Sequence, residues 1–320
     1  MNKPNIVILD GFVANPGDLS WDTIAAFGQL TVYDRTSDEE LIDRAKEAEI
    51  LIINKRTLSR DTLYRLERLQ CICLLSTGYN SVDIQAAKER GIVVCNAVGY
   101  GSSSVAQHVF ALLLELTNNI GLHNRSVQQN GWATSIDWCY SKIPLTELKE
   151  KTMGIYGLGK IGQEVAKIAL AFGMQVIATR KNPNKSTPPA IQLVNFDRLL
   201  KESDVLTLHA PLTKENEQII NATHLSMMKP RAYLINTGRG GLVNELDLKQ
   251  ALLKGTIAGA GLDVLSVEPP PLNHVLLNVP NCFITPHQAW TSKEARARLL
   301  EIVADNIKGF LAGNPQNVVS

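Results

Sequence analysis

The sequence predicts an α/β fold made of two doubly wound parallel-sheet domains. Short apolar runs alternate with amphipathic helical patterns from one end of the chain to the other, which is typical of parallel sheets covered by helices. The chain has 320 residues, of which 45% are hydrophobic, and this length exceeds what one compact domain usually holds. A second series of strand patterns also begins near the middle of the chain, after an irregular stretch.

The first series of elements lies within residues 5–96. Strands are expected in five apolar runs, at residues 5–10, 30–34, 49–54, 71–77 and 92–96. Amphipathic helices are expected between them, most clearly at residues 37–48 and 59–69. This part of the chain is therefore expected to form one α/β unit.

The second series begins after an expected domain boundary. Two features of the sequence mark it, a long apolar helix pattern at residues 102–120 and a less periodic stretch at 130–144. Strands are then expected at residues 152–157, 175–180, 205–210, 232–237, 259–264 and 282–287, again with helices between them. The last helix, at residues 291–313, follows the final strand, so we expect it to pack back on the first domain.

Composition narrows the function. The formal net charge is +1 without a long run of one sign, so we expect a small-molecule partner, with no nucleic acid and no membrane. The start of the chain, MNKPNIVILDGF, has too short an apolar run for a signal peptide or a membrane span, which favours a cytoplasmic location. The cysteines form neither a CxxC pair nor an even framework, so buried thiols are expected rather than disulfides or a metal site, at Cys71, Cys73, Cys95, Cys139 and Cys282.

A glycine-rich turn, GLGKIG, follows the strand pattern TMGIY and opens the helix pattern KIGQEVAKIALAFG. Gly157 permits a tight turn, Gly159 lets a pyrophosphate approach the backbone, and Gly162 lets helix and strand pack closely. The amides at the helix N-terminus would then bind the anion. The turn alone is a weak indication, but its position between a strand and a helix predicts a dinucleotide site.

The next strand ends in ATRKN, with Arg180 and Lys181 where such sites usually place an acid. An acid there accepts a hydrogen bond from the ribose 2′-OH of NAD, whereas an arginine can pair with the 2′-phosphate of NADP. Thr179 adds a possible hydroxyl donor. We therefore expect NADP(H) to be preferred, with NAD(H) possible; the alternative is that Arg180 is a solvated surface charge.

Three residues in the second half follow expected strands: Arg239 in INTGRGG, Glu268 in SVEPPP and His287 in ITPHQAW. Residues in these positions lie at the carboxyl edge of a doubly wound sheet, where ligands bind. Histidine can protonate a forming alkoxide, a nearby glutamate favours and orients the imidazolium, and arginine can hold a carboxylate. Each residue also has a purely structural alternative: Arg239 could anchor a loop, Glu268 could cap a turn, and His287 could be a hydrogen-bonded histidine of the core.

The ordered motifs GLGKIG, INTGRGG, GLDVLSVEPPP and ITPHQAW resemble the D-isomer specific 2-hydroxyacid dehydrogenase family over essentially the whole chain. Three further stretches resemble its glycerate dehydrogenase or hydroxypyruvate reductase branch more than its phosphoglycerate, formate or lactate branches: STGYNSVD, VAQHVFALLLEL and DWCYSKIPLTELKEKTMGIYG. The resemblance implies two Rossmann-like domains, with the nucleotide-binding domain inserted into the substrate domain. The implied boundaries are residues 1–98 plus 287–320 for the substrate domain and 99–286 for the nucleotide-binding domain.

The resemblance also implies residue roles. Arg239 matches the arginine that binds the substrate carboxylate, Glu268 the acid paired with the catalytic histidine, and His287 the proton donor, which also contacts substrate. The backbone amides of Ser76, Thr77 and Gly78 match those that help hold the carboxylate, and Asp263 matches the acid that contacts the nicotinamide carboxamide. Cofactor contacts are expected from Gly157, Leu158, Gly159, Lys160, Ile161, Gly162, Thr179, Arg180, Lys181, His209, Pro211, Thr237, Gly238 and Asp263.

Together these features predict an NADPH-preferring reductase that converts hydroxypyruvate or glyoxylate to D-glycerate or glycolate. One alternative is an NAD-dependent D-glycerate dehydrogenase in which Arg180 is incidental. Another, of a different class, is a nucleotide-sensing corepressor-like binding protein. The helix pattern at 102–120 is apolar over more than one face, and with the resemblance it predicts a homodimer, with Trp138 reaching toward the partner.

Overall fold

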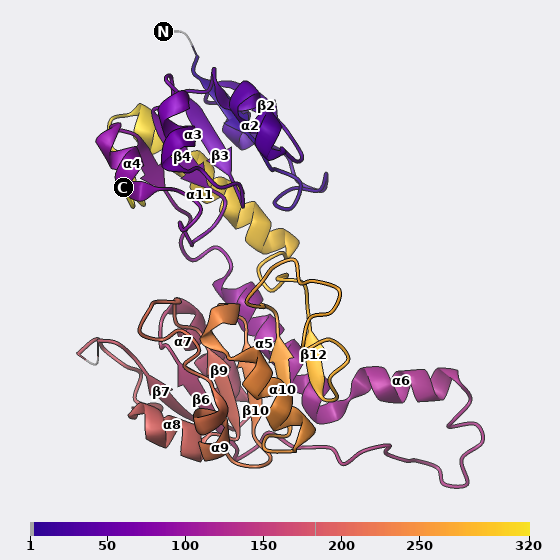
Figure 1. Cartoon of the computed structure of the whole chain (residues 1–320). Coiled ribbons are helices and arrows are strands. Elements are labelled where there is room, and N and C mark those ends of the chain that lie inside the picture. Colours follow the sequence, from indigo (N-terminus) through magenta and orange to yellow (C-terminus); the bar gives the residue numbers. More distant parts are fainter. Residues whose placement is uncertain (1–2, 183) are drawn as a thin grey trace. The chain divides into compact units, whose positions relative to one another are not determined.

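The computed structural model describes residues 3–182 and 184–320 and divides the chain into two compact units (Figure 1). Unit 1 comprises Met1–Gly101 with Trp290–Ser320, and unit 2 comprises Ser102–Ala289. Unit 1 has a five-stranded sheet in the order β2-β1-β3-β4-β5, and unit 2 has a seven-stranded sheet in the order β12-β11-β10-β9-β6-β7-β8. Neighbouring strands are parallel in both sheets, which confirms the predicted fold class and the insertion of one unit into the other.

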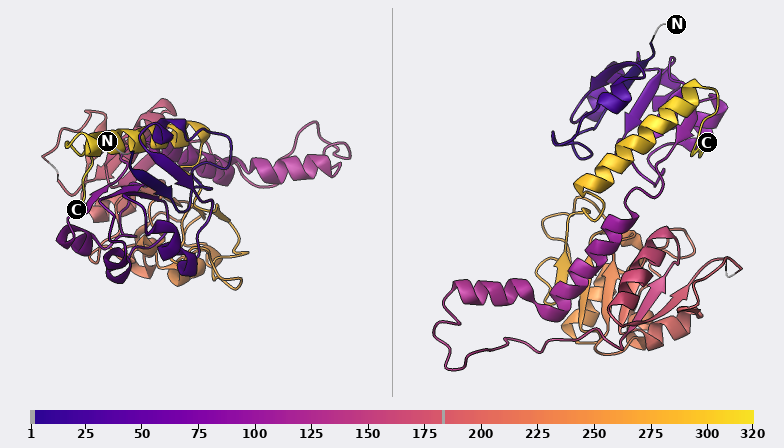
Figure 2. Two further views of the ribbon diagram at one scale, coloured as in Figure 1. Left: turned by 90° about the horizontal axis from the view of Figure 1, so that it is seen from above. Right: turned by 180° about the vertical axis from the view of Figure 1, so that it is seen from behind.

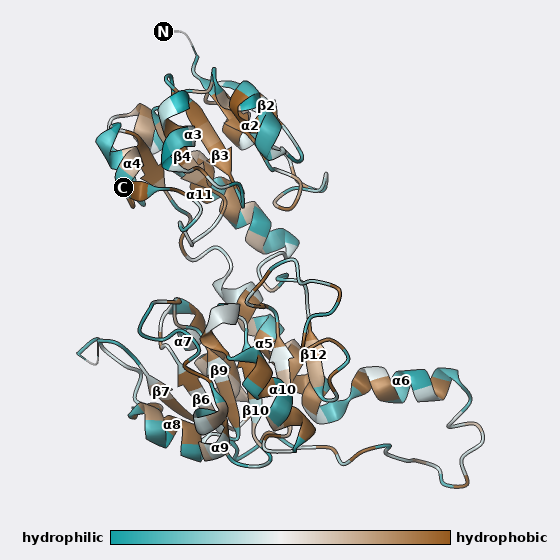
Figure 3. Cartoon of the chain, viewed as in Figure 1, coloured by the Kyte–Doolittle hydropathy of each residue, from teal (hydrophilic) through white to brown (hydrophobic). Residues whose placement is uncertain are grey.

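Unit 1 is built around two strands that are buried at every position. These strands, β3 and β4, read as continuous apolar runs because both faces of a parallel sheet are covered (Figure 3). The strands are β1 (Asn5–Ile8), β2 (Gln29–Val32), β3 (Ile50–Ile53), β4 (Cys71–Leu74) and β5 (Val93–Cys95). The helices are α1 (Asp22–Ala25), α2 (Asp38–Ala45), α3 (Arg60–Arg65), α4 (Ile84–Glu89) and α11 (Lys293–Leu311).

The last helix packs on the first domain, as predicted. Helix α11 contacts α1 and β4, and Leu299, Val303 and Ile307 on it are buried. After α11, the final residues run along the edge of the five-stranded sheet, where Val319 N donates to Val94 O. The side chain of Asn306 on α11 is also buried and donates to Asn96 O. The end of the chain is therefore an integral part of unit 1.

Unit 2 has helices on both faces of its sheet. Helices α5 and α7 cover one face, and α8, α9 and α10 cover the other, each enclosing a separate apolar core. The strands are β6 (Thr152–Tyr156), β7 (Gln175–Thr179), β8 (Ile191–Leu193), β9 (Val205–Leu208), β10 (Tyr233–Asn236), β11 (Gly259–Leu262) and β12 (Cys282–Ile284). The helices are α5 (Ser102–Asn118), α6 (Ile120–Gln128), α7 (Lys160–Ala171), α8 (Phe196–Glu202), α9 (Ala222–Met227), α10 (Glu245–Leu253) and the short 3₁₀ helix η1 (Gly240–Leu242).

The helix expected at 102–120 is interrupted near its end. Asn119 has a φ of 48°, in the left-handed region, and it separates α5 from α6. Helix α6 and the irregular segment after it project from the rest of unit 2, as both views in Figure 2 show. We call residues 119–150 the arm. It exposes several large apolar side chains, namely Ile120, Val127, Trp132, Ile136, Trp138 and Leu145.

The structure differs from the expectations in three further details. The divisions between units each fall three residues after the expected boundary, so His287 lies in unit 2. Cys139, on the arm, is exposed, and Cys282 is only partly buried, whereas the other thiols are buried as expected. The short strand β8 was not predicted, because its sequence, IQL, has a polar glutamine at its centre and so gives no continuous apolar run. Within the described part of the chain, no helix is long and apolar enough to cross a membrane.

Candidate active site

Three neighbouring strands of unit 2 bring the predicted reaction residues to one edge. Asn236 pairs with Leu262, and Leu262 pairs with Ile284, so β10, β11 and β12 end side by side. The segments that leave these strands therefore start next to one another at the carboxyl edge, where α/β sheets bind ligands. They carry Arg239, then Asp263 and Glu268, and then His287.

His287 and Glu268 form a close pair. The Nδ1 atom of His287 lies 2.6 Å from Oε2 of Glu268, and both side chains are partly exposed. The other carboxylate oxygen, Oε1, accepts a hydrogen bond from Leu265 N at 3.0 Å. Because Nδ1 is bound to the carboxylate, Nε2 is the ring nitrogen available for a substrate. The geometry is that of a histidine held in orientation by an acid, as expected from the sequence.

The backbone of His287 is held by Asp263. His287 has a φ of 53°, and its N–H donates to Asp263 O at 2.8 Å. The Asp263 side chain is 1% exposed, and its oxygens accept hydrogen bonds from Thr285 Oγ1, Gln288 N and Ala289 N. A non-glycine residue in this region of φ/ψ space is strained and persists only where the surroundings fix it. Asp263 therefore fixes the loop that carries His287; its contact with a nicotinamide carboxamide stays a prediction.

Arg239 extends from a tight turn after β10. The buried side chain of Asn236 closes this turn, accepting from Gly238 N at 3.0 Å and donating to Arg239 O at 2.9 Å. The Arg239 side chain is exposed, and one guanidinium nitrogen donates to Gly238 O. Among the residues that the structure describes, the other four N–H bonds of this guanidinium have no partner, and their geometry suits a carboxylate.

The three glycines of GLGKIG differ in their surroundings. Gly157 has a φ of 101°, and a Cβ there would lie 2.7 Å from Ala210 N on the neighbouring β9 segment. A Cβ at Gly162 would lie 2.5 Å from Gly157 O, whereas a Cβ at Gly159 would meet nothing within 4 Å. Helix α7 starts at Lys160, directly after Gly159. The first and third glycines are therefore required by packing, and the middle one leaves open space at a helix N-terminus, where a phosphate is stabilised.

Two buried polar atoms near this turn have no hydrogen-bond partner in the part of the chain that the structure describes. They are His209 Nδ1 and Thr237 Oγ1, which follow the paired ends of β9 and β10. Burial lowers the pKa of His209 to about 3, so its ring is neutral and accepts at one nitrogen. Unsatisfied buried polar atoms are rare in folded proteins. Together with the open space at Gly159, these atoms fit a dinucleotide bound along this edge. Of the other expected cofactor residues, Thr179, Arg180 and Lys181 lie at the end of β7 and Asp263 follows β11, whereas the rest lie in the segments just described.

Arg180 lies at the end of β7 but is not a free surface charge. Its Nη1 donates to Lys185 O, Ser186 O and Thr187 Oγ1, and its Nη2 donates to Leu158 O at 2.9 Å. The guanidinium therefore connects the glycine-rich turn to the loop after β7. Nε and one hydrogen of Nη2 have no partner among the described residues. The sequence placed Arg180 at the correct strand end but did not indicate its second role as an anchor of this loop.

The substrate loop predicted in unit 1 follows β4. The carbonyl oxygens of Ser76, Thr77 and Gly78 accept hydrogen bonds from Ala97 N, Asn96 Nδ2 and Ser76 Oγ, respectively. None of their three N–H groups has a partner within residues 3–182 and 184–320. A loop whose acceptors are satisfied and whose donors are open is suited to bind an anion.

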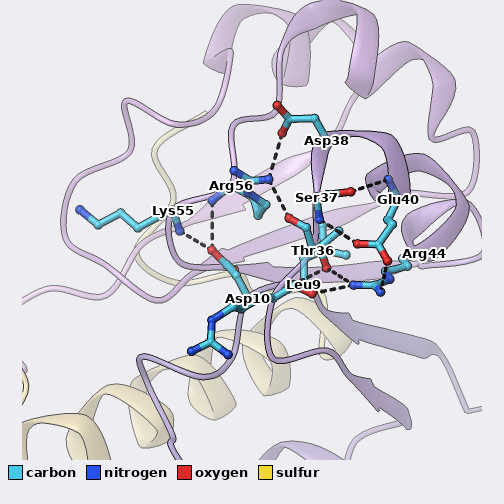
Figure 4. Close-up of polar contacts among 10 residues, drawn as sticks. Leu9, Asp10, Thr36, Ser37, Asp38, Glu40, Arg44, Lys55 and Arg56 are labelled. Carbon is cyan, nitrogen blue, oxygen red and sulfur yellow. Dashed lines mark hydrogen bonds and ion pairs between the residues drawn. The ribbon is translucent and has the colours of Figure 1, made fainter. Parts of the chain in front are cut away.

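The adjacent loop, after β3, contains a contact that the sequence analysis missed. The Asp10 carboxylate accepts hydrogen bonds from the consecutive amides of Asn54, Lys55 and Arg56, at 2.7, 2.6 and 3.1 Å. Figure 4 shows the contacts with Lys55 and Arg56. The Arg56 side chain is in turn paired with Asp38 at 2.9 Å. The only indication in the sequence was an acid at the end of the first apolar run, which is equally typical of a turn.

Comparison with known proteins gives consistent matches. Residues 110–289 match the family model of the D-isomer specific 2-hydroxyacid dehydrogenase, NAD binding domain. A hydroxypyruvate reductase of Blautia hydrogenotrophica is 45% identical over 98% of this chain and 99% of its own length. A glycerate dehydrogenase of Methylorubrum extorquens is 43% identical over 88% of each chain. These relatives confirm the resemblance drawn from the motifs, including its branch.

Two solved structures are similar in fold and differ in cofactor. An acyclic imino acid reductase in complex with NADPH and D-Arg has a TM-score of 0.87 and 33% identity, covering 99% of this chain and 100% of its own. A D-isomer specific 2-hydroxyacid dehydrogenase from Lactobacillus delbrueckii ssp. bulgaricus, in its NAD complexed form, has a TM-score of 0.80 and 26% identity over the same shares. The similarities indicate a nicotinamide cofactor without choosing between its two forms.

The glycine surroundings give a testable contrast between Gly159 and Gly162. Gly159→Ala is expected to change the free energy of unfolding by less than about 1 kcal/mol, because only the N-cap preference is affected, yet to weaken binding of NADPH and NADH. Gly162→Ala is expected to destabilise the protein by about 1–3 kcal/mol, because the new methyl group overlaps a backbone carbonyl. Thermal unfolding and calorimetric titration with each cofactor measure both effects. Unchanged cofactor affinity in Gly159→Ala would show that no pyrophosphate approaches this backbone.

Proposed function

We propose that this chain, which belongs to the D-isomer specific 2-hydroxyacid dehydrogenase family, reduces short 2-oxo acids, with hydroxypyruvate and glyoxylate as substrates and NADPH as preferred cofactor. The observation that carries the proposal is the His287–Glu268 pair, at 2.6 Å, beside the exposed Arg239 at the same sheet edge. The relatives support the choice of substrates, since proteins similar over nearly the whole chain are named hydroxypyruvate reductase and glycerate dehydrogenase.

His287 has the role of proton donor in this proposal. When bound, a reduced nicotinamide supplies a hydride to the keto carbon of the substrate. His287 transfers the proton on Nε2 to the former keto oxygen, so the C=O double bond becomes a hydroxyl-bearing single bond. Glu268 stays ionised, keeps Nδ1 oriented, and stabilises the ring while it is charged.

Substrate orientation depends on its carboxylate. The guanidinium of Arg239 has enough open N–H groups to bind both carboxylate oxygens. We assign a second set of donors to the open amides of Ser76, Thr77 and Gly78 in unit 1. Binding of both carboxylate oxygens by Arg239 would restrict how the keto carbon is presented to the hydride, and so the configuration of the product.

The preference for NADPH rests on Arg180. An arginine already fixed by four hydrogen bonds is pre-organised at the strand end where the adenosine ribose binds in this fold. Its open N–H groups and the exposed Lys181 suit a 2′-phosphate. The same hydrogen bonds also favour the second candidate, an NAD-dependent D-glycerate dehydrogenase in which Arg180 only shapes the loop.

We also propose a homodimer in the cytoplasm. The arm exposes six large apolar side chains, and exposed apolar patches of this kind mark protein interfaces (Figure 3). A second copy of the chain would cover them, with Trp138 directed toward the partner. The cytoplasm is supported by the five free cysteines, since free thiols persist in reducing compartments.

His287→Gln tests the reaction. We expect kcat for hydroxypyruvate to fall by about 10²–10⁴-fold, the usual cost of losing a positioned acid, with NADPH affinity unchanged. Steady-state rates and a fluorescence titration of NADPH measure the two quantities. Undiminished turnover would remove His287 from this role. Cofactor binding without turnover of any 2-oxo acid by the wild-type protein would favour the nucleotide-sensing alternative.

Arg180→Asp tests the cofactor preference. A carboxylate in place of the cation repels a 2′-phosphate at a cost of several kcal/mol, so the NADPH-to-NADH ratio of kcat/KM should fall by about 100-fold or more. Because the variant also loses the loop anchor, the effect is judged by the ratio of the two kcat/KM values and not by either value alone. Arg180→Gln removes the positive charge without adding a negative one, so it should lower this ratio less. Lys201→Asp, an equal charge change at the opposite end of the sheet, is the control. An unchanged ratio in Arg180→Asp would support the NAD-dependent candidate.

The dimer is tested by sedimentation at micromolar concentration. We expect the mass of two chains for the wild type and of one chain for the double variant Ile136→Asp with Leu145→Asp, because charges would replace apolar contacts of the arm. Leu272→Asp, which changes an equally exposed apolar residue outside the arm, should stay dimeric. A wild-type monomer would contradict the proposal, and a monomeric Leu272→Asp would move the interface away from the arm.

A further inference from the structure

We propose that Glu245, at the start of α10, is a positioning residue for Glu268. It fixes the loop from Leu265 to His274 against the Arg239 turn, and through this loop it sets the position of the acid that holds His287. The inference rests on the proposed function, since it concerns the same site.

Glu245 binds both ends of this loop. Its Oε1 accepts from Ser266 N at 2.8 Å, and its Oε2 accepts from Ser266 Oγ at 2.6 Å. The same Oε2 lies 3.1 Å from Nε2 of His274. The side chains of Glu245 and His274 are only 12% and 6% exposed, so solvent does not replace these contacts easily. One largely buried carboxylate therefore holds the two ends of the loop together.

The direction of the hydrogen bond from His274 follows from its second ring nitrogen. Leu276 N donates to Nδ1 of His274, at 3.4 Å, so Nδ1 is an acceptor. The ring hydrogen then lies on Nε2, which donates to Glu245. All three bonds to Glu245 are consequently donated to it, and a carboxyl group largely shielded from water requires such partners.

The contact with Glu245 is transmitted to Glu268 through the backbone. Leu265 N donates to Glu268 and Ser266 N donates to Glu245, so two consecutive amides are each held by one of the two carboxylates. A shift of Ser266 would turn the peptide that binds Glu268. The carboxylate of Glu268 would then lose its alignment with His287.

The peptide between Leu265 and Ser266, whose N–H binds Glu245, packs against the arginine turn. A Cβ at Gly240 would lie 1.9 Å from Leu265 C and 2.3 Å from Ser266 N, so the two backbones are in direct contact there. Arg239 and Gly240 lie in the short segment between β10 and α10, and Glu245 is the first residue of α10. Glu245 therefore joins the segment of the carboxylate-binding residue to the loop of the acid.

A purely structural role would be shared by another acid of the same helix. Asp247 also lies in the first turn of α10, and its carboxylate accepts from Ala222 N at 2.8 Å, at the start of α9. It has the same favourable position relative to the helix dipole and the same kind of contact with another segment. It does not bind the loop of Glu268, so Asp247→Ala is a control for the loss of an acid at the start of this helix.

The test is a double-mutant cycle of Glu245→Ala and Glu268→Gln, measured by kcat and KM for hydroxypyruvate with NADPH. We expect Glu245→Ala to lower kcat at least tenfold with KM for NADPH unchanged, and to cost less than about twofold when Glu268→Gln is already present, because coupled residues are not additive. Asp247→Ala should lower the melting temperature to a similar extent and leave kcat unchanged. Equal factors in both backgrounds, or an equal loss of kcat in Asp247→Ala, would overturn the proposal.

A second readout does not depend on turnover. In protein labelled with ¹⁵N-histidine, the ring signals of His287, assigned with His287→Gln, should move in Glu245→Ala toward their positions in Glu268→Gln and stay in place in Asp247→Ala. Unmoved signals in Glu245→Ala would refute the positioning role even if the wild type reduced no 2-oxo acid, an outcome that would refute only the proposed function. Glu245→Gln, which keeps one acceptor for Ser266 N, should shift both readouts in the same direction and serves if Glu245→Ala does not fold.

Discussion

Asp263 follows β11 with its carboxylate almost completely buried, and the loop that carries His287 closes around it. Two backbone amides and one hydroxyl donate to its oxygens, and its own carbonyl accepts from His287 N. A buried carboxylate deprived of such donors costs several kcal/mol, and the left-handed conformation of His287 costs about 1–3 kcal/mol. Each cost is tolerated because of the other: the loop needs an acceptor that holds it in this shape, and the carboxylate needs the donors that the loop provides.

The same arrangement recurs around both sheets. Loops that leave the carboxyl edge of a parallel sheet turn their amides away from the strands, and these amides need acceptors. Asp263 supplies them for the loop after β12, Glu245 for the loop after β11, and Asp10 for the loop after β3 in unit 1. In each case an acid on one segment fixes the backbone of another. The proposed site residues His287 and Glu268 are thereby carried on loops whose shape is set by carboxylates, those of Asp263 and Glu245, rather than by regular structure.

The parts of this architecture that the sequence predicted are those encoded locally. Buried strands appeared as apolar runs, and the spacing of the glycines in GLGKIG indicated a tight turn between a strand and a helix. Arg239, Glu268 and His287 were identified because each follows an apolar run. The contacts that the sequence did not predict join distant segments. Asp10 and Glu245 have the appearance of ordinary turn and helix-start acids, Arg180 meets its partners only once the loop after β7 folds back, and the exposure of Cys139 depends on an arm whose course no periodicity describes. For such residues the residue type indicates a hydrogen-bonding capacity, but only the fold supplies the partner.

The return of the chain to unit 1 has a consequence for the order in which the protein is made. The buried face of β4 is covered by α11, and the residues after this helix complete the edge of the sheet beside β5. Unit 2 is synthesised as one uninterrupted stretch between these two parts. At about 5–20 residues per second, the roughly 190 residues of unit 2 separate them by about 10–40 s on the ribosome. Unit 1 is thus begun first and completed last. Its apolar strands leave the ribosome before their covering helix is made, so a ribosome-associated chaperone could bind their exposed apolar surface.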